Sequence, residues 1–231
     1  MADVVSLMER PVYTYPQVDR LLELSEGTSH RWLNGYRRRS VWYEPILRSE
    51  PSDTRWVTWG EFVEARLFAG YRDVDRIDTK QLRVYVQELR RRFNVRYPLA
   101  YAAPYVRAEG RRLMWEAQQV AGLPDRFAVE VGSNQIMLAP WVESFVQSVD
   151  FDESEGVARK LPPDPDFPDV YVDPLLRGGE PTIAGHNVRV RTVASFVRCG
   201  EDPAEVAEWY GLNLDEVRQA VGYDQVHAAI G

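Results

Sequence analysis

The stretch that decides the fold is VYVDPLLRGGEPTIAGHNVRV, residues 170–190, together with the helical patterns that follow it. Two short extended pieces, 181–183 and 188–190, flank Gly185-His186-Asn187, which favours a tight turn between them. Beyond the turn, apolar residues recur at helical spacing in three successive segments, and the second of these begins at Asp202-Pro203. Residues 170–231 therefore predict a C-terminal three-helix domain with short strands.

This part of the chain resembles a small domain of bacterial antitoxins of the VapB family, whose pattern is D-P-x(n)-G-x-P-x-I-x-G-T-R-[IV]-x-V followed by helices. The positions that match are Asp173, Pro174, Gly179, Pro181, Ile183, Gly185, Val188, Val190 and Gly200. The chain departs at His186-Asn187, where the family has Thr-Arg, and the effect of this departure stays open. The resemblance implies the antitoxin of a type II toxin–antitoxin pair, with a PIN-domain ribonuclease toxin as its partner.

The N-terminal residues predict a helix-turn-helix unit. Pro16 suits the first turn of one helix, and a second helix runs from Thr28 to Asn34 with Ser25 as its expected cap. Ser29, Trp32, Leu33 and Tyr36 are expected to face inward, and Gly27, His30, Arg31 and Asn34 outward. The run Thr28-Ser29-His30-Arg31-Trp32-Leu33 resembles the second helix of regulators related to the MerR family.

The outward face of this second helix predicts binding of duplex operator DNA. The predicted DNA-contacting residues are Gly27, Thr28, His30, Arg31, Asn34, Arg37, Arg38 and Arg39. Arg31 can bond guanine and Asn34 adenine, while the arginines after the helix would hold phosphates. Readers of this kind usually pair on two half-sites, so a homodimer is expected. The alternative is a plain two-helix packing unit with a solvated basic end.

The middle of the chain predicts helices, then strands, then a linker. A capping box at Thr58 and Glu61 starts one helix, and a second starts near Asp78-Thr79; this helical extension and the helix-turn-helix together make up residues 1–100. Residues 101–150 predict a β-hairpin element, with strands at 105–107, 112–115, 128–131 and 135–138 and turns at Glu109-Gly110 and Gly132-Ser133-Asn134. Residues 151–169 predict an extended Pro/Asp-rich linker whose acids Asp164, Asp166 and Asp169 are solvated and hold no metal.

The charge is distributed unevenly within a net charge of −7. Residues 1–115 carry 20 Lys and Arg against 15 Asp and Glu, and residues 116–231 carry 8 against 20. This asymmetry favours nucleic acid as partner of the front half and a basic protein as partner of the rear half. The alternative is ordinary surface charge that keeps the protein soluble. Phe196, Trp209 and Tyr210 are candidate anchors for that protein, although at least two of them are expected in the domain's own core.

One cysteine, Cys199, excludes an internal disulfide framework and fits a reducing cytoplasm, and we expect it to be a small buried hydrophobe. No apolar run approaches the length of a membrane helix. His30, His186 and His227 lie far apart in sequence and form neither a metal-ligand nor a nucleophile–base spacing, so neither an enzyme nor a cofactor is expected.

The sequence thus predicts a mainly α protein with a small β element. It predicts an antitoxin that neutralises its toxin and binds operator DNA to regulate its own operon. Two alternatives stay open: a stand-alone DNA-binding transcription regulator with a ligand- or protein-sensing rear half, and a structural interaction module.

Overall fold

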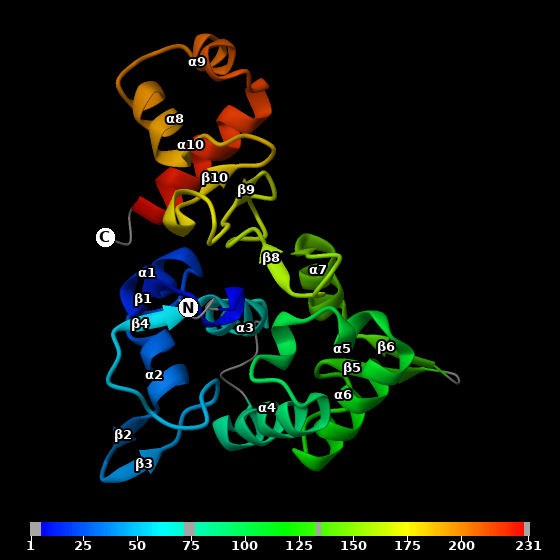
Figure 1. The fold of residues 1–231 in the computed structure, drawn as a ribbon. Helices are drawn as coiled ribbons and strands as arrows, with labels where there is room; N and C mark the ends of the chain where they lie inside the picture. Colours follow the sequence, from blue (N-terminus) through cyan, green and yellow to red (C-terminus); the bar gives the residue numbers. More distant parts are fainter. Residues whose placement is uncertain (1–5, 72–76, 133–134, 229–231) are drawn as a thin grey trace, which may run out of the picture.

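In a computed structural model the chain folds mainly into helices, with small antiparallel two-stranded sheets between them (Figure 1). This confirms the predicted mainly α class with small β elements. The structure describes residues 6–71, 77–132 and 135–228. Among the helices of these ranges, none combines the length and the apolar composition that crossing a bilayer requires.

The N-terminal part packs a strand pair and two short helices against a central helix. Its elements are η1 (Leu7–Glu9), β1 (Pro11–Thr14), α1 (Tyr15–Leu21), α2 (Thr28–Asn34), β2 (Tyr36–Arg38), β3 (Val41–Tyr43), β4 (Trp56–Thr58) and α3 (Trp59–Ala69). β1 pairs with β4, and the predicted capping box of Thr58 and Glu61 is present at the start of α3. Because α3 is buried from Trp59 to Phe68, it forms the centre of this part of the molecule.

The middle of the chain is more helical than its sequence predicts. It contains α4 (Thr79–Phe93), η3 (Pro98–Ala100), α5 (Ala103–Val106), α6 (Ala108–Val120), β5 (Val129–Gly132), β6 (Gln135–Leu138) and α7 (Pro140–Ser148). The predicted strands at 105–107 and 112–115 are wrong, whereas the hairpin that ends at 138 is present as β5–β6. Two residues of its predicted turn, Ser133 and Asn134, lie outside the described residues.

The predicted turn at Glu109-Gly110 is also wrong, because both residues lie inside α6. Gly110 is needed where the backbone of α5 packs closely against α6. A Cβ at this position would lie 2.2 Å from the backbone oxygen of Ala103 and 2.8 Å from that of Pro104. The glycine therefore permits α5 and α6 to approach closely, and it marks no reversal of the chain.

The prediction of a solvated linker at 151–169 is wrong. β7 (Asp150–Phe151) pairs with β8 (Ala158–Lys160), and Val157, Ala158 and Leu161 are buried in the front core. The indole Nε1 of Trp59 donates to Ala158 O at 2.7 Å, and Nε of Arg66 donates to Pro162 O at 3.0 Å. The prolines do exclude helix here, but the apolar residues between them and these two donors from α3 fix the segment to the body.

Residues 170–228 place three helices over a short strand pair. The elements are β9 (Val170–Tyr171), η4 (Arg177–Gly179), β10 (Thr182–Ile183), α8 (Val190–Arg198), α9 (Pro203–Tyr210) and α10 (Leu214–Ala228). Their apolar residues form a second core, which includes Val193, Val206 and Val217 and is separate from the front core. Cys199 is exposed, contrary to expectation, because it follows α8 outside the buried stripe of that helix.

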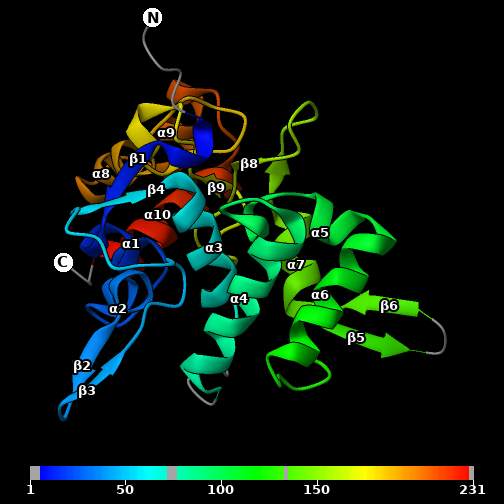
Figure 2. The ribbon, with the colours of Figure 1, turned by 60° about the horizontal axis from the view of Figure 1, so that its bottom comes forward.

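Figures 1 and 2 show the β2–β3 hairpin and the α8–α9 pair at opposite ends of the molecule. Between them, α10 lies near α1, and the phenol of Tyr13 in β1 donates to Gly179 O at 2.7 Å. The C-terminal domain is thus joined to the front part by side-chain contacts as well as by the chain itself.

Candidate nucleic-acid interface

The predicted helix pair is present as α1 and α2, joined by residues 22–27. Asp19 of α1 caps α2: its carboxylate accepts from the backbone N–H of Gly27 and of Ser29, each at 2.7 Å. The predicted cap, Ser25, contributes only its backbone carbonyl, which accepts from Thr28 N–H. Because Gly27 adopts a left-handed conformation with φ of 75°, the chain can turn sharply into α2.

The exposed side of α2 presents part of the predicted set. Ser29 and Leu33 are buried as expected, while Trp32 is only partly buried. His30 is exposed, and its ring meets that of Tyr15 edge to face, with centroids 5.0 Å apart. Arg31 is half-buried, and its guanidinium donates to Thr28 Oγ1 at 2.6 Å. Gly27 and Thr28 complete this side of the helix start.

Asn34 is buried, so the prediction that its side chain faces outward and reads adenine is wrong. It is 6% exposed, and its Nδ2 donates to the phenol oxygen of Tyr15 at 2.7 Å. Its Oδ1 accepts from Arg48 Nη1 at 2.8 Å and from Ser52 N–H at 3.0 Å. The chain at 46–52 returns over the end of α2, so the Asn34 amide makes its hydrogen bonds within the protein.

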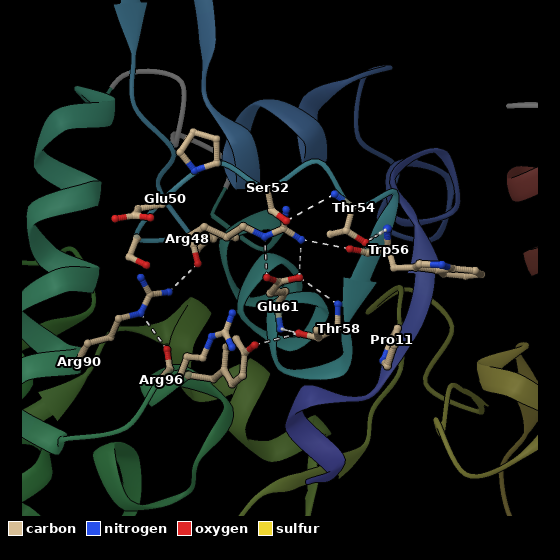
Figure 3. Close-up of a pocket in the computed structure, with 14 residues that line it drawn as sticks. Pro11, Arg48, Glu50, Ser52, Thr54, Trp56, Thr58, Glu61, Arg90 and Arg96 are labelled. Carbon is tan, nitrogen blue, oxygen red and sulfur yellow. Dashed lines mark hydrogen bonds and ion pairs between the residues drawn. The ribbon is translucent and has the colours of Figure 1, made fainter. Parts of the chain in front are cut away.

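Arg48 organises a buried polar network beneath α2 (Figure 3). It pairs bidentately with Glu61, through Nε–Oε1 at 2.7 Å and Nη2–Oε2 at 2.9 Å, and Nη1 also donates to Tyr15 at 2.8 Å. Burial lowers the pKa of Arg48, but the hydrogen bonds and charge of Glu61 outweigh it and raise the pKa. The network locks β4, α2 and α3 together, which holds the α1–α2 pair in a fixed orientation.

A cavity of about 410 Å³ opens beside this network and is the second feature that Figure 3 shows. Three arginines line it, and each already has a carboxylate partner: Arg48 with Glu61, Arg90 with Glu64 and Arg96 with Glu9. Because Arg48 and Arg96 are paired with carboxylates of the protein itself, these two cations offer little free charge to an anionic ligand in the cavity.

The β2–β3 hairpin carries the basic residues that follow α2. Arg37, Arg38 and Arg39 are all exposed, and the turn at Arg39-Ser40 has φ of 47° and 69°, the sign that two-residue hairpin turns favour. Tyr36 and Tyr43 stack across the strands, with ring centroids 4.8 Å apart. The three arginines therefore project on a structured hairpin next to α2.

Sequence reasoning missed two exposed apolar residues of this hairpin. Trp42 is 43% exposed and pairs across the strands with Arg37, and Val41 is 54% exposed and pairs with Arg38. The signal was present in YRRRSVWY, where aromatic and β-branched residues flank a two-residue turn. The run of arginines concealed it, since such a run also fits a solvated tail.

A second exposed surface lies on the C-terminal domain. Phe196 of α8 and Trp209 of α9 are 36% and 54% exposed, and their rings meet edge to face with centroids 5.7 Å apart. Tyr210 is partly buried against the second core. The expectation that at least two of these three residues lie inside the core is wrong, because Val193, Val206 and Ala207 fill the inward faces of the two helices.

The departures from the antitoxin pattern have local partners. Asn187 Oδ1 accepts from Arg177 Nε at 2.9 Å, and His186 Nε2 lies 3.7 Å from Glu216 Oε1. The fold brings His227 within reach of Glu23 and Asp164 as a potential metal-ligand group. Sequence spacing could not find this group, because its members come from three distant segments.

Residues 170–223 match the family model described as a protein of unknown function, DUF433. Among solved structures, the crystal structure of Rv2018 from Mycobacterium tuberculosis matches with a TM-score of 0.75 and 22% identity, over 94% of this chain and 100% of that one. At this identity the likeness shows a shared fold.

Two proteins of Mycobacterium tuberculosis are similar over nearly the whole chain. The protein named putative antitoxin VapB45 is 27% identical over 226 residues, covering 91% of this chain and 92% of its own. The protein named uncharacterized protein Rv2308 is 40% identical over 222 residues, covering 95% of this chain and 92% of its own. The chain therefore belongs to the same protein family as Rv2308.

Proposed function

We propose that this protein is an antitoxin that binds duplex operator DNA through α2 and the β2–β3 hairpin and neutralises a PIN-domain ribonuclease toxin through its C-terminal domain. The observation that carries the proposal is the basic hairpin, with exposed Arg37, Arg38 and Arg39, directly after the helix pair. The printed name of the 27% identical relative, putative antitoxin, supports the antitoxin role.

The charge of the hairpin favours a polyanion. In the ranges that the structure describes, no carboxylate forms an ion pair with Arg37, Arg38 or Arg39. Free guanidinium groups on a projecting hairpin bind phosphates and release counterions. With Asn34 withdrawn into the core, His30 and Arg31 are the long side chains of α2 left to contact base edges, alongside Gly27 and Thr28.

The exposed pair of Phe196 and Trp209 is the proposed anchor for the toxin. Aromatic side chains dominate the energetics of protein interfaces. Both rings are exposed, and the helices that carry them, α8 and α9, lie at one end of the molecule. The acidic balance of residues 116–231 suits a partner whose surface is basic because it handles RNA. The PIN-domain class of this toxin is implied by the resemblance of residues 170–231 to antitoxin domains.

The two proposed surfaces face opposite ends of the molecule, so one chain can hold DNA and toxin at the same time (Figure 1). Reading of two half-sites requires a two-fold pair of chains, and we expect a homodimer. Light scattering that finds a monomer both with and without DNA would count against that pairing.

DNA binding is tested with the full-length chain and the DNA upstream of its own reading frame, by fluorescence anisotropy over a range of salt concentrations. Replacing Arg37, Arg38 and Arg39 by alanine should weaken binding to all sequences and reduce the salt slope by about 0.9 per lost phosphate contact. The matched control replaces three exposed arginines elsewhere, Arg112, Arg126 and Arg218, and removes the same charge. Equal losses in the two triple variants would contradict a specific role for the hairpin.

Toxin binding is tested by coexpression with the product of the adjacent reading frame. The wild-type chain should rescue growth and copurify with that product, and the double variant Phe196→Ala, Trp209→Ala should do neither. The control is Trp56→Ala, which removes a tryptophan of similar exposure, 39%, from another part of the molecule. If the wild-type chain binds DNA and has no effect on growth, the stand-alone regulator is the better assignment.

A further inference from the structure

Three donor groups from distant parts of the sequence meet where α10 lies near α1. Glu23 follows α1, Asp164 belongs to the packed segment before β9, and His227 lies near the end of α10. Nε2 of His227 is 3.2 Å from Asp164 Oδ2 and 4.0 Å from Glu23 Oε1. One potential ligand atom from each residue lies within 4.8 Å of the other two.

The hydrogen bond on the other side of the imidazole fixes which nitrogen faces this group. Nδ1 of His227 lies 2.9 Å from the backbone oxygen of Arg20, and a carbonyl oxygen can only accept. Nδ1 therefore carries the proton. Nε2 then faces two carboxylates, and either a second ring proton or a metal ion between the three groups makes these contacts attractive.

The geometry points to a metal ion: we propose that Glu23, Asp164 and His227 bind one divalent transition-metal ion, such as Zn²⁺. A proton on Nε2 would satisfy Asp164 alone, because Glu23 at 4.0 Å lies beyond hydrogen-bond distance. A tetrahedral ion with bonds of about 2.0–2.2 Å holds its ligand atoms roughly 3.3 Å apart. His227 Nε2 and Asp164 Oδ2 have this spacing, and Glu23 Oε1, at 4.0 Å from Nε2, would move inward by rotation of its half-exposed side chain. Imidazole with carboxylates is a donor set that zinc accepts.

The partner of the second ring nitrogen of His227 also fits a bound ion. Metal-binding histidines usually donate their second ring N–H to a carbonyl or carboxylate, which is the arrangement of His227 with Arg20 O. Tyr223 stacks on the His227 ring at 3.9 Å, and its buried hydroxyl has no hydrogen-bond partner in the described part of the chain.

Exposure and charge leave the site accessible. The side chains of Asp164 and His227 are 7% and 6% exposed, whereas that of Glu23 is 45% exposed, so an ion and a water ligand can enter from the Glu23 side. Arg66 acts on Asp164 through its charge and offsets part of the negative charge of the two carboxylates. A bound ion would tie α10 to the end of α1, next to the proposed DNA-binding unit.

The test uses the full-length protein after treatment with a chelator. Titration with ZnCl₂ by calorimetry and with CoCl₂ by visible absorption should find one ion per chain, with the absorption of a four-coordinate Co²⁺ site. Glu23→Gln, Asp164→Asn and His227→Gln should each weaken binding by at least the roughly 10–100-fold that loss of an outer partner costs such sites. The control is His186→Gln, which breaks a partly exposed His–Glu pair and should leave binding unchanged.

Absence of binding by the wild-type chain, or binding that survives in His227→Gln, overturns the proposal. So does ¹⁵N NMR that finds protons on both ring nitrogens of His227 in the presence of Zn²⁺. If the two buried substitutions disturb folding by circular dichroism, Glu23→Gln decides, since its side chain is half exposed and it keeps its shape.

Discussion

Replacement of Arg48 by methionine should destabilise the fold more than loss of an exposed ion pair. Arg48 donates five hydrogen bonds, two of them to the carboxylate of Glu61. Methionine keeps much of the side-chain volume and removes the cation, which leaves Glu61 as a charge that is 1% exposed. Among the bonds that remain to this carboxylate is the one from Thr58 N–H at 2.9 Å.

The magnitude follows from that uncompensated charge. Removing one partner of a buried ion pair costs about 3–5 kcal/mol, against a total stability of about 5–15 kcal/mol for a typical protein. With a urea dependence of about 1–3 kcal/mol per molar, the midpoint of unfolding should fall by roughly 1–5 M. The double variant Arg48→Met, Glu61→Gln should recover much of the loss, because no buried charge is left unpaired.

The assay is urea unfolding at pH 7, followed by tryptophan fluorescence and far-ultraviolet circular dichroism. The matched control is Arg91→Met, which breaks an exposed pair with Glu88 and should move the midpoint little. A loss below about 1 kcal/mol for Arg48→Met, or a double variant no more stable than the single one, would refute the reasoning that the two buried charges of this pair compensate each other.

Three further outcomes are expected. Burial raises the pKa of Glu64 to about 7, so the folded state favours its protonated form. The contribution of this protonated group to the free energy of unfolding is present below the unfolded pKa near 4.5 and is lost as pH rises through 7. The stability of wild type relative to Glu64→Gln, measured by urea unfolding, should therefore fall by up to about 3 kcal/mol between pH 5 and pH 8, and an unchanged difference would contradict it. Gly110→Ala should lower stability by about 1–3 kcal/mol, since the added Cβ meets backbone oxygens that cannot move aside; an unchanged Tm would contradict this. Arg31→Ala should cost about 1–3 kcal/mol on the cognate DNA and relax one base position, whereas Asn34→Ala should alter stability and leave base preference intact; binding assays over a set of single-base variants decide.

The parts of the fold that the sequence predicted correctly are those set by local patterns. The capping box at Thr58 and Glu61, the start of α4 after Asp78 and the three C-terminal helices all follow from caps and helical periodicity. These signals act within a few residues of the chain, so a single sequence contains them in full.

Glu109-Gly110 carries the composition of a turn, but Gly110 lies within α6, and the backbone of the neighbouring helix α5 leaves no room there for a Cβ. The other failures come from contact between residues far apart in sequence. Asn34 lies on a polar face of α2, but the chain at 46–52 returns over it. The acids before β9 have the composition of a solvated segment, yet Asp164 is buried against α10. None of these approaches leaves a trace in local spacing.

The packed segment between α7 and β9 also sets an order of events during synthesis. The front core includes Leu161 and Val172, so a chain still attached to the ribosome cannot complete that core until residue 172 has emerged. At about 5–20 residues per second, the passage from residue 149 to residue 172 takes roughly 1–5 s. Until they emerge, Val157, Ala158 and Leu161 are missing from the front core of the nascent chain. The C-terminal domain then forms last, after Val172 near its start has completed the front core.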